Sequence, residues 1–270
     1  GVNLRFVYHY LSKTKISAYV TGGSQLKLNQ ANLNRVPICL PQIEIQDAIV
    51  AILDSFMQLE AELEAELKSR KKQYEHYRNQ LLTFPEQGGV RWVPMGDVIK
   101  YKQPGPFLVS STEYSDIFPT PVLTAGQSFV LGYTNESQGI YKATKSDPTI
   151  IFDDFTTSNK WVDFNFKAKS SAMKMLVPKD ERLNLRFAYF YLQTINFQPK
   201  EHARHWIGTF AKFRMPLPEL SDQIKIVETL DKFDAIVNDL SIGLPAELAA
   251  RRKQYEYYRG KLLTFTELEA

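Results

Sequence analysis

Two groups of side chains in this sequence have the types and spacing that catalytic sites use. Asp153 and Asp154 form a carboxylate pair of the kind that can hold a divalent metal. Metal-dependent nucleases also place an acid two residues before a lysine, and no such acid precedes Lys167. Ser171 and Lys174 have the Ser-Xaa-Xaa-Lys spacing of acyl-transfer enzymes, but the Ser-Asp-Asn and Lys-Thr-Gly elements that accompany it are absent. We therefore expect the two aspartates to end a strand and expect no catalytic residue.

The remaining reactive side chains also predict no metal or cofactor site. His202 and His205 have a spacing that can bind metal, but no cysteine or clear carboxylate stands near them, so a binding or surface role is favoured. The single cysteine, Cys39, lies in an apolar segment, which is typical of a small buried residue, and it excludes a disulfide within the chain. No glycine-rich phosphate loop occurs, so we expect no bound cofactor.

Binding residues are concentrated in the middle of the chain. Residues 91–219 contain 16 basic and 12 acidic side chains, whereas residues 45–84 contain 5 basic and 7 acidic ones. Loops in this basic segment mix amides, hydroxyls, cations and aromatics, the mixture that contacts phosphates and base edges. The candidate DNA-binding residues there are Thr124, Gly126, Gln127, Tyr133, Lys160, Trp161, Lys167, Lys169, Ser170, Ser171, Lys174, His202, Arg204, His205 and Trp206.

An internal repeat organises the elements that position these loops. Asn-Leu-Arg-Phe at residues 3–6 recurs at residues 184–187, and Lys-Gln-Tyr-Glu at residues 72–75 recurs at residues 253–256, so both offsets are 181. Between these blocks the offset is 177, as in the matches of Leu40-Pro41 with Leu217-Pro218 and of Phe56 with Phe233. The two copies flank the basic segment and predict the same structure twice.

The second half of each copy has the apolar periodicity of a long helix. Ile45, Ile49, Ile52, Phe56, Leu59 and Leu63 follow a coiled-coil seam, which resumes at Leu67 after a stutter. The first helix would be roughly 60 Å long. Its counterpart, at residues 222–265, is interrupted at Gly243-Leu244-Pro245, where glycine ends one helix and proline begins the next. We expect the two helices to pack antiparallel, with Phe56, Leu59 and Leu63 facing Phe233, Val237 or Leu240.

The segment between the helices predicts a mixed domain. Short β-type runs occur at residues 121–123, 149–152 and 173–177, separated by Gly, Pro, Asn and Ser clusters, and a helix is expected over Leu185 to Thr194. The predicted fold class is therefore α/β, with a mixed α/β recognition domain and two long antiparallel coiled-coil helices.

This order of elements resembles the specificity subunits of Type I restriction-modification systems over essentially the whole chain. The resemblance rests on the repeated Tyr-rich helix, the Leu-Pro strand end and the long helix that ends in Lys-Gln-Tyr-Glu and Leu-Leu-Thr-Phe. It implies a remnant of a first target-recognition domain (residues 1–44), a first conserved helix (45–86), a second target-recognition domain (87–220) and a second conserved helix (221–270). A polar loop at residues 22–29 resembles one that members place near DNA, which adds Gln25 and Lys27 to the candidates.

The resemblance also implies the function and partners. The chain would be a non-catalytic subunit that reads half of a bipartite target in double-stranded DNA and scaffolds methyltransferase (modification) and restriction subunits. Two copies could read both halves as a homodimer joined through the long helices. The first domain would be either naturally shortened or lost from a fragment. A coiled-coil protein-interaction adaptor without a DNA role is the alternative. With no apolar run of 18 residues and no signal peptide, we expect a cytoplasmic location and no membrane partner.

Overall fold

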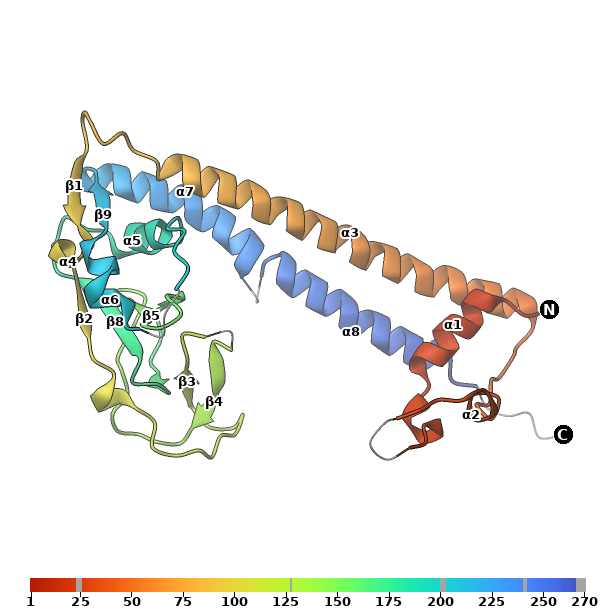
Figure 1. Cartoon of the computed structure of the whole chain (residues 1–270). Coiled ribbons are helices and arrows are strands. Elements are labelled where there is room, and N and C mark those ends of the chain that lie inside the picture. The colour runs from red at the N-terminus through yellow and green to blue at the C-terminus, as the bar shows by residue number, and fades with distance from the viewer. Residues whose placement is uncertain (23–25, 127, 200–202, 240–241, 266–270) are drawn as a thin grey trace. The chain divides into compact units, whose positions relative to one another are not determined.

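A computed structural model describes residues 1–22, 26–126, 128–199, 203–239 and 242–265. The chain divides into two compact units (Figure 1). Unit 1 contains Gly1–Gln73 and Asp234–Ala270, and unit 2 contains Tyr74–Phe233. Helices dominate unit 1, whereas the described residues of unit 2 form three sheets together with helices, so the predicted mixed α/β fold class is confirmed.

Three helices form the long elements that the repeat predicts. The first, α3 (Ile43–Leu81), has 39 residues and contributes to both units. The second copy is split into α7 (Leu220–Asn238) and α8 (Leu244–Leu262). Gly243 is the N-cap of α8, and Pro245 lies in its first turn, where the missing amide costs no hydrogen bond. The predicted helix break is therefore confirmed.

In unit 1, α3 and α8 run antiparallel. The rings of Phe56 and Tyr258 stack with their centroids 5.4 Å apart. Further along α3, Glu60 accepts a hydrogen bond from Arg252 Nε at 2.6 Å, and Glu64 pairs with the same guanidinium. Because the later residues of α3 meet the earlier residue of α8, the two helices have opposite directions.

The predicted register of this helix pair is wrong. Phe56 was expected to face Phe233, but in unit 2 the Phe233 ring stacks on Tyr77, with centroids 5.4 Å apart. In an antiparallel pair the beginning of one copy meets the end of the other, so equivalent positions do not face each other. The buried positions follow the predicted seam only in part, because Ile49 is buried as expected, whereas Ile52 is 43% exposed and its neighbour Leu53 is 0% exposed.

Unit 1 has a small apolar core built around α1 (Leu4–Lys13). Phe6 of α1 is buried with Ile49, Leu53 and Leu263. The unit also contains the 3-10 helix η1 (Ile16–Tyr19) and the short helix α2 (Gln30–Leu33). The core therefore joins the first helix of the chain to the beginning of α3 and the end of α8.

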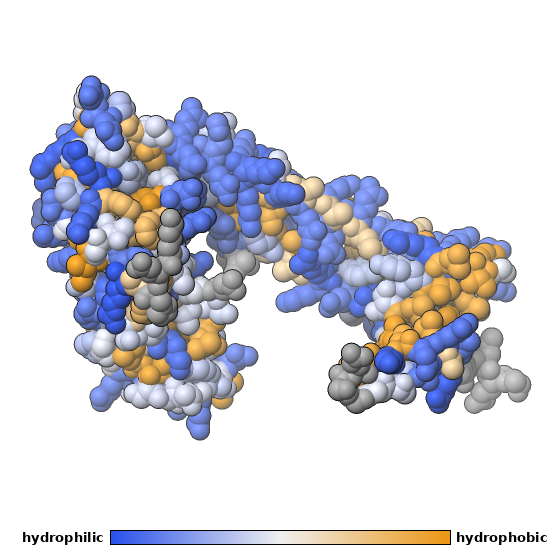
Figure 2. Space-filling model, in the orientation of Figure 1, coloured by the Kyte–Doolittle hydropathy of each residue, from blue (hydrophilic) through white to orange (hydrophobic). Residues whose placement is uncertain are grey.

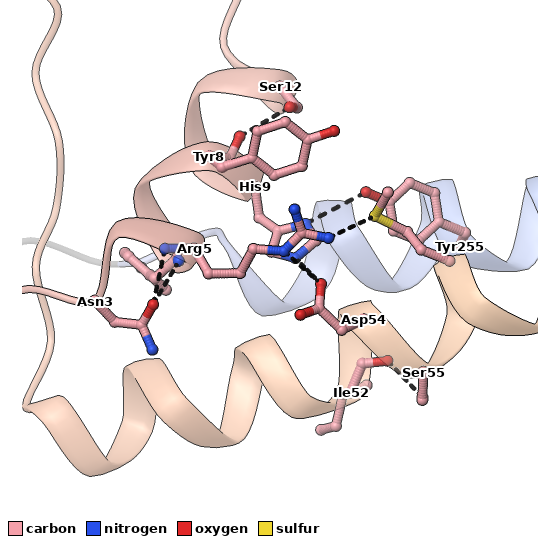
Figure 3. Close-up of polar contacts among 11 residues, drawn as sticks. Asn3, Arg5, Tyr8, His9, Ser12, Ile52, Asp54, Ser55 and Tyr255 are labelled. Carbon is pink, nitrogen blue, oxygen red and sulfur yellow. Dashed lines mark hydrogen bonds and ion pairs between the residues drawn. The ribbon is translucent and has the colours of Figure 1, made fainter.

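A polar cluster next to this core fixes α1 on α3 (Figure 3). The side chain of Asp54 lies 2.8 Å from Arg5 Nε and 2.8 Å from Nε2 of the fully buried His9. The other ring nitrogen of His9 faces the Tyr255 hydroxyl at 3.4 Å. Burial raises the pKa of Asp54, but the hydrogen bonds from His9 and Arg5 outweigh it, and the pKa is lowered.

Unit 2 contains three sheets. Strands β1 (Arg91–Pro94) and β9 (Arg214–Leu217) pair antiparallel. A four-stranded antiparallel sheet has the order β2 (Ile99–Lys102), β8 (Met173–Pro178), β5 (Thr149–Asp153) and β6 (Asn159–Val162). A three-stranded sheet has the order β4 (Val130–Thr134), β3 (Thr120–Leu123) and β7 (Lys167–Ala168). Besides the end of α3 and most of α7, the helices are α4 (Met95–Val98), η2 (Gly105–Phe107), α5 (Leu185–Leu192), α6 (His205–Gly208) and η3 (Phe210–Lys212).

The predicted runs at residues 121–123, 149–152 and 173–177 are confirmed as β3, β5 and β8. An aromatic core lies beside the four-stranded sheet. The Phe152 ring packs against Trp206 and Phe210, with centroid distances of 5.2 and 5.0 Å. This core ties α6 and η3 to the sheet.

The repeated sequence makes the same polar contacts in each unit. In unit 1, Gln46 Oε1 accepts from the Asn3 amide at 2.9 Å, and Gln46 Nε2 donates to the Pro41 carbonyl at 2.6 Å. In unit 2, Gln223 bonds in the same way to the Asn184 amide and the Pro218 carbonyl, at 2.9 and 2.8 Å. The ion pair of Arg5 with Asp54 likewise recurs as Arg186 with Asp231, at 2.7 Å.

Candidate functional site

One end of the four-stranded sheet in unit 2 carries most of the predicted binding loops. Because neighbouring strands are antiparallel, β2 and β5 end there and β8 and β6 begin there (Figure 1). Residues 154–158 join β5 to β6, and residues 169–172 join β7 to β8. The sheet therefore brings together loops that are far apart in sequence.

The segment that leads into α6 is attached to this sheet end through one residue, Asp154. The Asp154 carbonyl accepts from the His205 amide at 2.8 Å, and its Oδ1 accepts from the Trp206 amide at 2.8 Å. The Asp154 amide donates to the Ala172 carbonyl at 3.0 Å. Three loops therefore meet at Asp154.

The carboxylate of Asp154 is neutralised inside the unit. Its Oδ2 lies 3.1 Å from Lys174 Nζ, and both side chains are 1% exposed. The ammonium of Lys174 also donates to Gln103 Oε1 at 3.4 Å and lies 4.8 Å from the centre of the Tyr101 ring. Burial of either charge alone would be costly, so the two groups depend on each other.

Exposed cations and hydroxyls lie on the loops around this pair. Arg204, Lys169 and Ser171 are exposed, and Ser170 is half-buried. The Lys169 amide donates to the Leu123 carbonyl at 3.0 Å, so the end of β3 lies beside the 169–172 loop.

The next predicted loop follows β3. There the Thr124 hydroxyl donates to the Ser128 carbonyl at 2.5 Å and accepts from the Gly126 amide at 3.2 Å. This arrangement places a hydroxyl-stabilised turn next to Lys169.

Four predicted contact residues lie inside unit 2 instead of on its surface. Lys167, Lys174, His205 and Trp206 are all buried. Lys167 pairs with Glu136 and donates to the Gln138 carbonyl at 2.9 Å. A side chain enclosed in this way has no surface with which to reach a phosphate or a base, so the structure favours positioning roles for these four residues.

The carboxylate that pairs with Lys167 is itself strongly hydrogen bonded. Glu136 accepts from Lys167 and from the Ser111 and Ser110 amides, and these bonds lower its pKa. Gly139, with φ +61, lies beside this site, since an added Cβ would stand 3.4 Å from Lys167 Nζ and 2.6 Å from the Pro106 carbonyl oxygen. The cluster joins the segment before β3, the segment after β4 and strand β7.

The other predicted residues are spread more widely. Trp161 packs on the Tyr189 ring at 5.8 Å, and the Arg186 guanidinium lies 4.9 Å from the Trp161 ring, so this tryptophan joins β6 to α5. Tyr133 on β4 and Lys160 on β6 are half-buried. Lys27 is exposed in unit 1, whereas Gln25, Gln127 and His202 lie outside the described residues.

The turn between β5 and β6 contains a strained residue. Thr157 has φ +60, a conformation that β-branched residues rarely adopt and that costs about 1–3 kcal/mol. Asp153 supports the turn, because its Oδ1 accepts from the Phe155 and Thr156 amides at 2.9 and 2.8 Å. The expectation that the two aspartates end a strand is confirmed, since β5 ends at Asp153.

Sequence reasoning missed the role of Asp154. A signal was present, because Lys174 interrupts the apolar run of β8 and requires a partner once that strand is buried.

Within the described residues, no group of three or more His, Cys, Asp or Glu side chains could hold a metal ion. In the same part of the chain, every helix is too short or too polar to cross a membrane.

Comparisons with known proteins identify the family. The model of the Type I restriction modification DNA specificity domain matches residues 1–70 and 89–250. The chain is 48% identical over 190 residues to the Type I restriction enzyme EcoR124I/EcoR124II specificity subunit of Escherichia coli, covering 67% of this chain and 46% of that protein. It is 31% identical to a putative type I restriction enzyme specificity subunit of Haemophilus influenzae, over 98% of this chain and 73% of the relative.

The fold agrees with this match. The Type I restriction-modification S subunit from M. genitalium superposes with a TM-score of 0.65 at 17% identity, over 98% of this chain and 74% of that one. The chain thus spans about half the length of its E. coli relative and about three quarters of the others. With most of its sequence matched by the family model, the chain belongs to the family of the Type I restriction modification DNA specificity domain.

Proposed function

We propose that this chain recognises a DNA sequence for a Type I restriction-modification enzyme and does not itself catalyse a reaction. The observation that carries the proposal is the set of loops at one end of the four-stranded sheet in unit 2. They present Arg204, Lys169 and Ser171 to solvent, around the buried pair of Asp154 and Lys174. Cations supply phosphate attraction, and hydroxyl and guanidinium groups can read base edges.

The exposure of each predicted side chain decides whether we propose that it contacts DNA. Arg204, Lys169, Ser170 and Ser171 would contact DNA, with the Thr124 to Gly126 turn beside them. Lys167, Lys174, His205 and Trp206 would support these loops from inside the unit. Lys27 remains a proposed contact in unit 1.

We also propose that residues 1–44 are the end of a first recognition domain, followed by a conserved helix, a second recognition domain (87–220) and a second helix. Support comes from comparing α1 with its repeat, α5. Leu185 of α5 is 7% exposed, whereas the equivalent Leu4 of α1 is 82% exposed. Figure 2 shows apolar residues gathered over α1. In unit 2, β6 lies next to α5, and Trp161 packs there. The exposure of Leu4 supports the proposal, because its counterpart in unit 2 is covered.

The proposed partners are double-stranded DNA and the methyltransferase and restriction subunits of the enzyme. S-adenosylmethionine would be bound by the methyltransferase subunit, and the complex would act on DNA in the cytoplasm. The proposed recognition domain at residues 87–220 would read half of a split target. Two copies joined through α3, α7 and α8 would read an inverted repeat, because a two-fold axis relates their domains.

The proposal is tested by measuring binding to duplex DNA over a range of salt concentrations. A DNA-reading subunit shows affinity that falls steeply with salt, because phosphate contacts release counterions. Binding that does not depend on salt, or no binding, favours the alternative of a coiled-coil adaptor for proteins. Mass measurement in the presence of DNA tests the homodimer, since a monomer rules it out.

A further inference from the structure

We propose that Asp154, held in place by Lys174, is a positioning residue for base recognition. It would set where Arg204 stands relative to Lys169 to Ser171. The inference rests on the proposed function and deepens it, because it assigns the geometry of the reading surface to a buried group that cannot touch DNA.

The geometry points to this role because Asp154 binds two other loops at once, the segment that leads into α6 and the loop that precedes β8. Its side chain and carbonyl take the two consecutive amides that follow Arg204, at 2.8 Å each. Its own amide binds Ala172, the residue that follows Ser171. Arg204 and Ser171 therefore each stand one residue away from a bond to Asp154.

The aromatic core holds the Trp206 side chain of the short helix α6, whereas Asp154 holds the backbone of its first turn. The helix has four residues, and its N-cap, Arg204, makes no side-chain capping bond. The first amides of a helix have no partner within the helix. Asp154 supplies acceptors to two of them and so determines the direction in which α6 begins.

Lys174 holds the orientation of the Asp154 carboxylate that binds the Trp206 amide. Its ammonium lies 3.1 Å from Oδ2, which leaves Oδ1 to accept from Trp206. Gln103 and the Tyr101 ring hold the ammonium from β2 and the segment after it. A rotation of the Asp154 side chain would break the bond to Trp206 and the ion pair together.

If Asp154 had only a structural role, any variant that folds would keep its target preference. Two double variants distinguish a structural role from a positioning role. Both remove the two buried charges together, so that neither charge is left buried alone. Asp154→Asn with Lys174→Met keeps an oxygen that can accept from Trp206. Asp154→Leu with Lys174→Met removes that oxygen and retains a side chain that branches at the same carbon. Replacement of a buried ion pair by apolar residues of similar volume is often neutral for stability.

The experiment selects targets from random duplexes with the full chain, in the assembly in which it binds DNA. Circular dichroism and the thermal midpoint Tm are measured for each variant. We expect the Asn variant to keep the wild-type preference. The Leu variant should fold but lose about tenfold in the ratio of target to non-target affinity, the scale of one lost base contact. Its non-specific affinity and salt dependence should stay unchanged, because Arg204 and Lys169 keep their charges.

Thr149→Val is the matched control. It removes a buried hydrogen bond, from the Thr149 hydroxyl to the Leu176 carbonyl at 2.9 Å. Thr149 begins β5, whereas Asp154 follows the end of that strand. The substitution should lower Tm and leave the target preference unchanged.

A folded Leu variant with the wild-type preference overturns the inference. If that variant does not fold, hydrogen exchange of the wild-type chain decides: the His205 and Trp206 amides should be protected as strongly as the amides of β5, and exchange at the rate of an open loop overturns the inference. A wild-type chain with no target preference refutes the proposed function instead, and the exchange result still tests the bonds to Asp154.

Discussion

The rings of Phe56 and Tyr258 stack in unit 1 with centroids 5.4 Å apart and planes inclined by 17°. Their repeat partners, Phe233 and Tyr77, stack in unit 2 at the same distance with planes inclined by 22°. The repeated sequence therefore makes one helix contact twice, each time between the first part of one copy and the last part of the other.

The first prediction concerns this helix contact. Phe56→Ala should reduce the free energy of unfolding by about 2 kcal/mol, because it removes a half-buried ring and an aromatic pair. Ile52→Ala on the same helix is the control and should change it by less than about 1 kcal/mol, since Ile52 is largely exposed. Denaturant unfolding measures both. Equal losses would contradict the proposed importance of the stacked pair.

The second prediction concerns the proposed phosphate contacts. Arg204→Ala and Lys169→Ala should each weaken binding to duplex DNA and reduce the slope of log affinity against log salt by about one. Lys179→Ala is the control, because Lys179 is also exposed but follows the opposite end of β8. If Lys179→Ala weakens binding as much as the other two changes, the sheet end carrying Asp154 is not the DNA-facing end.

The third prediction is a pH dependence at Glu136. Its pKa is lowered by the hydrogen bond from Lys167 and by backbone amides, so the folded state favours the charged form. A lowered acid pKa stabilises the protein above the ordinary pKa of Glu, about 4.3, and this contribution is lost as the pH falls through the folded value. Glu136→Gln should therefore cost about 2 kcal/mol at pH 7.

The cost of Glu136→Gln should shrink as the pH falls below 4, where the wild type also loses the charge. Thermal unfolding of both proteins from pH 7 to pH 3 measures the difference. Glu113→Gln provides a control, because Glu113 is an exposed acid in the same unit. A cost that stays constant over this range would contradict a role for the Glu136 charge.

The fourth prediction tests whether helix length sets the spacing of a split target. Insertion of seven residues after Leu63, matched by seven after Arg251, keeps the apolar seam in phase and lengthens the helix pair by about 10 Å. The preferred gap should increase by about three base pairs, with the same bases read on either side. Target selection compares the two proteins. An unchanged gap would show that the length of these helices does not set the spacing of the target.

The apolar periodicity and the internal repeat were sufficient to predict the long helices and part of the central domain. The long helices, their break at Gly243 and three strands of the central domain all follow from local patterns that tertiary packing did not override. The helix register was not predictable from the seam alone. Apolar residues at equivalent repeat positions are compatible with several pairings, and the antiparallel direction places Phe56 against Tyr258.

Exposure at the candidate site was harder to predict from sequence. Lys174, His205 and Trp206 have residue types that occur in DNA-binding loops, but a central strand and an aromatic core enclose them. The partners that make their burial tolerable come from distant segments, such as Asp154 for Lys174. The composition of a loop does not distinguish side chains that contact a ligand from side chains that hold the loop in place.

Whether this chain reads DNA is decided by selecting preferred targets from random duplexes with the wild-type chain at two salt concentrations. We expect a defined sequence preference, with affinity that falls as salt rises. Target binding should weaken in Arg204→Ala and remain unchanged in Lys179→Ala. Duplexes recovered without any common sequence, or binding unaffected by salt, would contradict the claim that this chain reads DNA.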